Sequence, residues 1–386
     1  MPVTTLATIA VVAVATTIAP LISDRLARWV VIPSAVLEIL LGILIGPQVL
    51  GWASENDVIG FIADSGLAML MFLAGYELEF GQVRGKPLRL AAAGWACSLA
   101  LGLGIGLLLH GFSPGALVVG LALTTTALGT TLPMVGDAGL LGTPLGARIL
   151  AVGAFGEFGP IIAVALLLSG QRPMRTALVL VGFAVVAGIA LWLASRPRSE
   201  RLRRLIATTL GTSVQFGVRL AMLVVVLMLW IAGGLGLDVL LGAFTAGLVV
   251  RLFLDAGDPR ETAIVHTKLE GIGFGLLIPF FFVVSGMRYD LDSLLAAPAA
   301  LLLIPASVIA FFVVRGLPVL VLHRRDLPRR PRWTLALLAS AALPMVVVIT
   351  TIGTEIGVLP AANASALVGA AMLSILVFPL VALRGP

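Results

Sequence analysis

The sequence predicts an all-α polytopic membrane protein, and three observations support this fold class. Hydrophobic residues make up 60% of the 386 positions and charged residues only 11%, whereas roughly a quarter of the residues in a soluble domain are charged. The mean hydropathy is +1.13. The apolar residues also gather in runs of about 20, the length of a helix that crosses a bilayer. We therefore expect a single transmembrane domain over residues 1–386 and no soluble regulatory domain.

Thirteen apolar runs are predicted to form transmembrane helices. In chain order they cover residues 3–22, 30–46, 57–76, 88–110, 113–134, 144–169, 175–194, 208–232, 237–254, 268–288, 298–322, 332–353 and 361–383. The first run is interpreted as a span because no basic stretch precedes it, as one would in a cleaved signal peptide.

The lysines and arginines between these runs predict the orientation. With the N-terminus outside, twenty of them fall in inner connections and only Arg172, Arg175 and Arg288 fall in outer ones. Cytoplasmic loops carry such an excess of positive charge. We expect a multi-pass protein of the cell inner (plasma) membrane with a cytoplasmic C-terminus. The net charge of +6 is explained by this orientation and does not indicate nucleic-acid binding.

Few residues suit a resident metal, a redox group or a membrane protease. The single cysteine, Cys97, excludes an intrachain disulfide, and the three histidines fall at the ends of apolar runs. This pattern predicts no cofactor and no metal beyond a transported ion. The sequence also lacks paired intramembrane aspartates and an HExxH motif. We therefore do not expect an enzyme.

Two pairs of similar segments recur at one spacing. Gly75 precedes Glu79 by four positions, as Gly286 precedes Asp290, and the two glycines are 211 positions apart. The two LPMV segments are also 211 positions apart. Shared spacing of independent matches indicates a duplicated unit.

This duplication predicts the organisation of the domain. One repeat would cover about 3–169, a linker helix about 175–194, and a second repeat about 208–383. The odd linker helix inverts the second repeat relative to the first. Inverted repeats are typical of secondary transporters, whose substrate site lies near the midplane where the repeats meet.

Each LPMV segment places a proline inside a predicted span. Proline removes a backbone donor and clashes with the preceding turn, so Pro133 and Pro344 are each expected to break or kink a helix. Such breaks are tolerated in a membrane where they are buried or line a cavity. Thr125 and Thr126, in the run LTTTALGTT, can either satisfy freed backbone groups or offer the oxygen ligands that hard cations prefer. We expect these residues to form one ion site.

Glu157 is an unusual residue within these spans. It lies in the run AVGAFGEFGPII, and no cationic residue falls between Arg148 and Arg172. A charge at a helix centre costs roughly 2.5–3.5 kcal/mol, so such residues generally pair or line a pathway. A buried carboxylate can bind a proton or a monovalent cation but not both, which suffices for exchange. The structural alternative is a salt bridge to the intramembrane Arg315 that only ties two helices together.

Two features of these spans leave alternatives open. Glu38, in the second predicted span, is either an accessory acid or a cavity-lining residue. Gly153, Gly156 and Gly159 recur every three residues beside Glu157. This small-residue stripe serves close helix packing, ion access or both.

Several segments together resemble a known family. PSAVLEILLGILIGPQVLG (33–51), SGLAMLMFLAGYELEF (65–80), IPFFFVVSGMRYDL (278–291) and the LPMV helices are similar to the monovalent cation/proton antiporters, in particular the bacterial sodium/proton and potassium/proton exchangers. The resemblance covers essentially the whole chain. It implies a thirteen-helix, sodium/proton antiporter-like fold, a homodimer, a core domain with two crossing broken helices, and elevator-like alternating access.

The resemblance also implies roles for individual residues. In that family the helix after the first broken helix carries the ion-binding carboxylate, usually an aspartate preceded by Asp, Asn or Gln. The matching position here is Glu157, preceded by Gly156, so this chain has a longer acid and lacks the polar partner. The family's basic residue after the FFVxxGM motif matches Arg315.

These inferences predict a secondary antiporter that exchanges Na⁺ or K⁺ for H⁺ across the lipid bilayer. Only one acid is evident at the core position, and arginine cannot release a proton in the working range. We therefore expect electroneutral 1:1 exchange with Glu157 as the shared site. Two alternatives stay open: a sodium-coupled organic-anion symporter, and a non-transporting sensor on the same scaffold.

Overall fold

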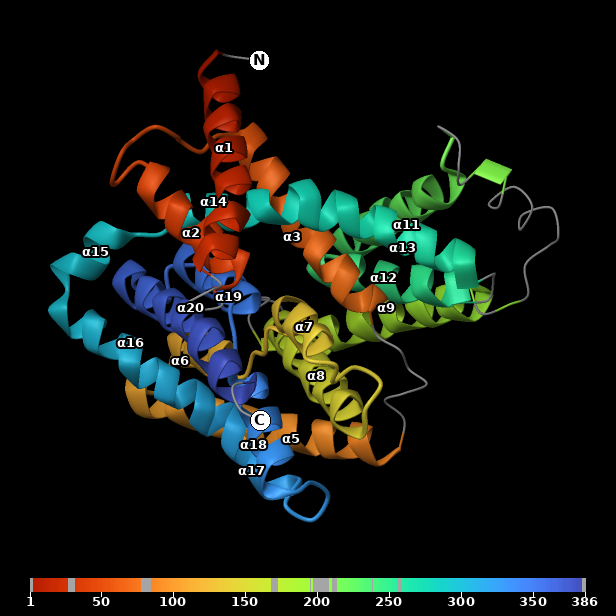
Figure 1. The fold of residues 1–386 in the computed structure, drawn as a ribbon. Coiled ribbons are helices and arrows are strands. Elements are labelled where there is room, and N and C mark those ends of the chain that lie inside the picture. The colour runs from red at the N-terminus through yellow and green to blue at the C-terminus, as the bar shows by residue number, and fades with distance from the viewer. Residues whose placement is uncertain are drawn as a thin grey trace. The chain divides into compact units, whose positions relative to one another are not determined.

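The computed structural model is almost entirely helical (Figure 1). It describes residues 3–26, 32–77, 85–167, 173–194, 196, 208–209, 214–237, 239–255 and 259–383. Glu79 of the predicted repeat motif lies outside the described residues. The chain divides into two compact units: unit 1 comprises residues 1–55, 79–168 and 282–386, and unit 2 comprises residues 56–78 and 169–281.

Unit 1 contains the segments in which the sequence predicts an ion site. Its helices are α1 (Val3–Leu26), α2 (Ser34–Ile45), α5 (Lys86–His110), α6 (Pro114–Leu123), α7 (Leu128–Asp137), α8 (Pro144–Leu167), most of α14 (Ile278–Met287), α15 (Leu291–Ala296), α16 (Pro298–Phe311), η2 (Phe312–Gly316), α17 (Leu317–Leu322), α18 (Arg329–Ser340), α19 (Pro344–Glu355) and α20 (Ala361–Leu383). Unit 2 contains α3 (Asp57–Tyr76), α9 (Pro173–Ala194), α11 (Phe216–Gly234), α12 (Val239–Asp255), α13 (Pro259–Ile272), η1 (Gly273–Leu277) and the first residues of α14.

The thirteen predicted spans all coincide with helices or helix pairs. Ten helical stretches among the described residues are long and apolar enough to cross a membrane. The other three predicted spans coincide with α2, α9 and the 17-residue α12, which fall short of that length or apolarity in the described residues. The polytopic, all-α class is therefore correct, while the number of thirteen spans stays a prediction.

Glycines allow helices to approach closely in each unit. A Cβ added to Gly286 of α14 would lie 2.1 Å from the carbonyl oxygen of Ile39 on α2. A Cβ on Gly75 of α3 would lie 2.2 Å from the carbonyl oxygen of Phe244 on α12. Both glycines of the predicted repeat motif therefore lie where a neighbouring helix backbone touches their own helix.

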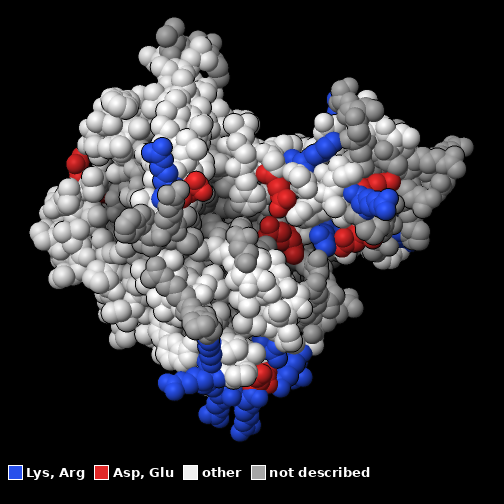
Figure 2. All heavy atoms as spheres, in the orientation of Figure 1, with Lys and Arg blue, Asp and Glu red and all other residues white. Residues whose placement is uncertain are grey.

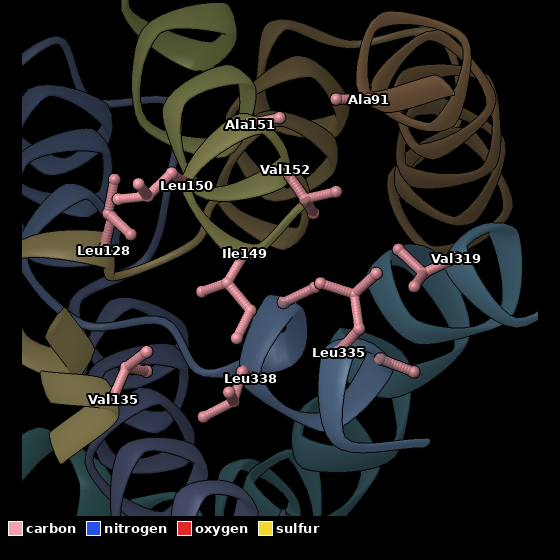
Figure 3. Close-up of a cluster of buried hydrophobic side chains, with 12 residues drawn as sticks. Ala91, Leu128, Val135, Ile149, Leu150, Ala151, Val152, Val319, Leu335 and Leu338 are labelled. Atoms are coloured by element: carbon pink, nitrogen blue, oxygen red, sulfur yellow. The ribbon is translucent and has the colours of Figure 1, made fainter. Parts of the chain in front are cut away.

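A cluster of apolar side chains holds together the helices around the predicted ion site. Figure 3 shows Ile149 of α8 and Leu335 and Leu338 of α18 pointing into the same space. The buried members come from α5, α7, α8, α17 and α18, and they are Ala91, Leu128, Val135, Ile149, Leu150, Ala151, Val152, Val319, Leu335, Ala336, Leu338 and Ala339. Because such interiors are close-packed, this cluster fixes α8 relative to α7 and α18.

Candidate functional site

The first helix interruption lies between α6 and α7. α6 ends at Leu123 and α7 begins at Leu128, so residues Thr124–Ala127 lie outside both helices. The hydroxyls of Thr124 and Thr125 donate hydrogen bonds of 2.8 Å to the carbonyls of Leu121 and Ala122 in the last turn of α6. Threonine side chains that bond the backbone in this way compete with helix continuation.

The interruption does not lie at Pro133, and a kink at this proline stays a prediction. That proline lies inside α7 (Leu128–Asp137) and not at the break. The threonines satisfy backbone acceptors at the end of α6, so the chain leaves the helix before it reaches the proline. Proline costs about 3 kcal/mol inside a helix, but this helix still extends over it.

The second interruption lies between α18 and α19. Residues Ala341–Leu343 separate Ser340 from Pro344, which is the first residue of α19. Proline suits this first position because its missing N–H would have no helical partner there. Ser374 of α20 accepts a hydrogen bond from the Ala342 N–H and donates one to the Ala342 carbonyl, both at 3.0 Å. Ser374 is not among the residues predicted from the sequence, where its only signal is a serine within a long apolar run.

The two interruptions are hydrogen-bonded to each other. The Ala127 N–H donates to the Ala341 carbonyl at 2.7 Å. The Thr126 hydroxyl donates to the Ala339 carbonyl at 2.5 Å, and the Thr126 N–H donates to the Gly156 carbonyl of α8 at 3.0 Å. The first interruption therefore joins α8 to the second interruption, one residue before Glu157.

Glu157 lies on α8 at the N-terminus of α7. Its side chain is buried, with 2% of the residue exposed. Oε1 accepts a hydrogen bond of 3.4 Å from the N–H of Gly129, the second residue of α7. Oε2 is buried and has no hydrogen-bond partner among the described residues. Helix N-termini favour negative charge, yet one carboxylate oxygen stays free to bind a proton or a small cation.

Arg315 is a second buried charge in the same unit. It lies in η2, a π-helical turn between α16 and α17, and only 1% of the residue is exposed. Its Nε donates to the Thr126 hydroxyl at 2.9 Å, Nη2 to the Val152 carbonyl at 3.0 Å, and Nη1 to the Ser98 hydroxyl at 3.4 Å. The guanidinium thereby links η2 to α5, α8 and the first interruption.

Glu157 and Arg315 do not form the salt bridge that the structural alternative required. The ion pairs among the described residues do not include these two side chains. The neutral partners of Arg315 hold its guanidinium in place, and the Oε2 atom of Glu157 keeps no protein partner. The carboxylate of Glu157 is therefore not occupied by a contact with Arg315.

The glycine that precedes Glu157 makes room for this arrangement. A Cβ on Gly156 would lie 2.4 Å from the Thr126 hydroxyl oxygen and 2.5 Å from Nη2 of Arg315. The space that a polar side chain would fill at position 156 is occupied by these two residues. The departure from the family pattern at this position thus has a physical reason.

The neighbouring glycines of α8 accommodate side chains in the same way. A Cβ on Gly153 would lie 2.6 Å from Leu128, and one on Gly159 would lie 2.1 Å from the ring of Trp95. Of the two functions left open for the glycine stripe, close packing is the one these contacts support.

The remaining predicted site residues are not bonded to Glu157 or Arg315 in the described part of the chain. Glu38 is buried on α2, and no hydrogen bond or ion pair among the described residues involves it. The hydroxyl of Thr125 is buried and bonded to α6, with its oxygen still able to accept. The described residues contain no group of three His, Cys, Asp or Glu side chains that could hold a metal ion.

A cavity of about 210 Å³ lies elsewhere in unit 1, beside the C-terminal half of α19. Ser285, Thr350, Thr354 and Ser365 contribute hydroxyl groups to its lining, and Glu157 does not line it. This cavity is therefore separate from the carboxylate.

Comparison with known proteins identifies what the whole chain is similar to. The family model described as "Sodium/hydrogen exchanger, transmembrane" matches residues 12–383. YjbQ of Bacillus subtilis (strain 168), a proposed Na⁺/H⁺ antiporter, is 27% identical over 396 aligned positions, which cover 98% of this chain and 62% of that protein. The Na⁺/H⁺-K⁺ antiporter GerN of Bacillus cereus is 24% identical over 303 positions, covering 74% of this chain and 72% of GerN.

A solved structure supports the fold. The sodium/proton antiporter MjNhaP1 from Methanocaldococcus jannaschii superposes with a TM-score of 0.72 at 16% identity, covering 97% of this chain and 95% of that one. This likeness establishes a shared architecture.

Proposed function

Because the chain belongs to the sodium/hydrogen exchanger family, we propose that it exchanges a monovalent cation, Na⁺ or K⁺, for H⁺ and that Glu157 is the shared binding group. The family consists of transporters, so the chain is a transporter and not an enzyme. The buried, unpartnered Oε2 atom of Glu157 beside two joined helix interruptions is the observation that carries the proposal.

The chemistry of one carboxylate explains the exchange. A proton and a metal ion compete for the same oxygen, so binding of one displaces the other. A bare carboxylate in the membrane is costly to move, whereas a loaded one is not. In alternating access the site therefore crosses loaded with either ion and returns loaded with the other. The N-terminus of α7 favours the negative charge of Glu157 while neither ion is bound.

The buried arginine bears on the stoichiometry. Arg315 stays protonated because a guanidinium does not release its proton in proteins. Its charge is therefore the same in every state, and the carboxylate gains a single positive charge with either H⁺ or a monovalent cation. Both loaded forms carry the same charge, which supports electroneutral 1:1 exchange.

Of the two roles that the sequence leaves open for Thr126, this proposal gives it hydrogen bonding rather than ion binding. Its hydroxyl donates to Ala339 and accepts from Arg315, so it holds the guanidinium beside α8 rather than binding the ion. Thr125 remains a candidate ligand through its lone pair, and Glu38 remains a candidate accessory acid.

The assembly and orientation are part of the same proposal. We expect a homodimer in the plasma membrane with its N-terminus outside and its C-terminus in the cytoplasm. The chain spans 62% of the length of YjbQ, so the activity of that longer protein comes to this chain only as a proposal.

Reconstituted vesicles test the proposal. Purified protein in proteoliposomes with a pH-sensitive dye should move protons when Li⁺, Na⁺, K⁺ or Rb⁺ is added, and the ion that responds identifies the substrate. Glu157→Gln should abolish the signal. Glu355→Gln, at an exposed acid at the end of α19, is the matched control and should retain it.

Four outcomes would redirect the assignment. Cation-dependent proton movement that persists in Glu157→Gln would move the binding group elsewhere. A current driven by membrane potential would contradict 1:1 exchange. Uptake of an organic anion with Na⁺ and without proton movement would favour the symporter, and the absence of any flux from folded protein would favour the sensor.

A further inference from the structure

Basic side chains gather on the connection between α17 and α18 and on the first turn of α18. Arg324, Arg325, Arg329 and Arg330 are all exposed, and we call these four residues the arginine loop. Figure 2 shows Lys and Arg side chains clustered at the end of unit 1 where Figure 1 places this connection. None of the ion pairs among the described residues includes any of the four. Their positive charges therefore face outward and pair with no acid in the part of the chain that the structure describes.

The acid in this connection does not neutralise the arginine loop. Asp326 is turned inward, with 5% of its side chain exposed, and it pairs with Lys86 of α5 at 2.5 Å. This bond from Lys86 holds the pKa of Asp326 below its ordinary value, so the carboxylate stays ionised and committed to α5. One acid is thereby removed from the surface and used to anchor the connection.

The backbone of the connection is also fixed. The His323 carbonyl accepts hydrogen bonds from the N–H groups of Asp326 and Leu327, at 3.1 and 3.0 Å. Pro328 then precedes the first residue of α18. A turn held in this way presents its arginines in a defined arrangement, which lowers the entropic cost of binding a ligand.

The arginine loop lies at the depth of lipid headgroups. One candidate span ends at Leu322 and the next begins at Arg329, so the loop joins two membrane boundaries directly. Trp333, 41% exposed, follows one turn into α18 and stacks on Phe312 with ring centroids 5.8 Å apart. Tryptophan is enriched at the membrane interface. The span boundaries therefore place the four arginines where the phosphate groups of a bilayer are expected.

We propose that the arginine loop is a binding surface for anionic phospholipid headgroups. Guanidinium groups bind phosphate oxygens through two parallel hydrogen bonds. Clusters of four or more basic residues directly beside a membrane span attract anionic lipids, whereas zwitterionic lipids carry no net charge to attract. The competing interpretation is that these arginines only orient the chain during insertion, which predicts no preference among lipids once the protein is in place.

Quenching of Trp333 by brominated lipids tests this surface. The full chain would be reconstituted into phosphatidylcholine vesicles with rising fractions of either brominated phosphatidylglycerol or brominated phosphatidylcholine. The contribution of Trp333 is the difference between the chain and Trp333→Phe. We expect brominated phosphatidylglycerol to quench Trp333 at a lipid fraction roughly ten times lower than brominated phosphatidylcholine does. The free energy of a tenfold preference is smaller than the combined attraction of four basic residues to an anionic membrane.

Two variants separate charge from fold. R324Q/R325Q/R329Q/R330Q should lose the preference, and R324K/R325K/R329K/R330K should retain most of it because lysine keeps the charge. Added NaCl should weaken the preference of the unmodified chain, since salt screens exposed charges. The salt series needs no variant and therefore still decides the matter if the glutamine variant fails to insert.

Either of two results would overturn the proposal. One is equal quenching of the unmodified chain by both lipids at low salt, and the other is an undiminished preference in the folded glutamine variant. The assay uses no ion gradient. Failure of the proposed exchange in a separate transport assay would consequently leave the lipid preference unaffected. Failure of the lipid preference would likewise leave the proposed exchange unaffected.

Discussion

The interruption between α6 and α7 and the interruption between α18 and α19 meet at one backbone hydrogen bond, yet they are held in different ways. The first, Thr124–Ala127, begins where threonine hydroxyls bond the last turn of α6, and it contains no proline. The second, Ala341–Leu343, runs into Pro344 and is bonded on both sides by Ser374. Similar backbone openings therefore arise from unrelated side chains.

The surroundings of the two interruptions also differ. The first contacts α8 beside Glu157 and holds Arg315 through Thr126. The second is fixed by α20, whose Ser374 touches neither charge. On the basis of this difference, we propose that the first interruption serves mainly substrate binding and the second mainly structural support. Substitutions at the two should separate along the same line.

Among substitutions that leave Glu157 in place, the largest effect is expected from Gly156→Ala. The new Cβ would overlap Thr126 and Arg315 at 2.4 and 2.5 Å, so the guanidinium must move. Overpacking of this kind costs about 1–3 kcal/mol of stability, and misplacement of a binding group by an ångström can cost roughly a hundredfold in rate. Thermal unfolding and proteoliposome exchange would measure both losses.

A matched glycine controls this experiment. Gly104 of α5 has open space where a Cβ would lie, so Gly104→Ala should leave unfolding and exchange unchanged. Normal exchange by Gly156→Ala would show that the room beside Arg315 has no functional importance.

The next effect is expected from Thr126→Val, which removes the hydroxyl but keeps the shape. A lost hydrogen bond to a charged group corresponds to about 1.5–3 kcal/mol, and a released Arg315 would compete with the cation for Glu157. The apparent KM for the cation should therefore rise roughly tenfold or more. Thr126→Ser should keep the KM close to that of the unmodified chain, and an equal rise in both variants would contradict the role of the hydroxyl.

A smaller and different effect is expected at the second interruption. Ser374→Ala leaves the Ala342 N–H buried without its partner, which costs about 1–3 kcal/mol of stability. Thermal unfolding should show this loss while the cation KM stays unchanged. A KM that rises as much as in Thr126→Val would abolish the distinction between the two interruptions.

The smallest effect is expected from Pro133→Ala. Because this proline lies inside α7 and the threonines end α6, its removal should leave the interruption open. Exchange should stay within a factor of about two, as for substitutions away from special features. Loss of exchange with a preserved fold would restore the proline as the cause of the break.

Much of this arrangement could be predicted from the residues. Long apolar runs specify helices because a segment that crosses the membrane must satisfy its own backbone hydrogen bonds. The isolated charges Glu157 and Arg315 are conspicuous within such runs. Pro344 also starts α19 directly after an interruption. These features depend on local composition, which a single sequence contains.

The remaining features depend on contacts between distant segments. Thr124 and Thr125 end a helix seven or more residues before the proline that suggested the break, because short side-chain bonds act before the proline does. The guanidinium beside Gly156 comes from residue 315, and the bonds to Ala342 come from residue 374. Periodicity along the chain carries no information on such pairs.

The π-helical turn at Phe312–Gly316 has a consequence for the phase of the helix that contains it. Its closing bond runs from the Leu317 N–H to the Phe312 carbonyl, so the turn holds one residue more than an α-helical turn. Each residue rotates an α-helix by about 100°. Deleting one residue there would turn either Arg315 away from Thr126 or the buried Val319 of α17 away from its neighbours. The single extra residue thus allows Arg315 and the buried Val319 of α17 to face their neighbours at the same time.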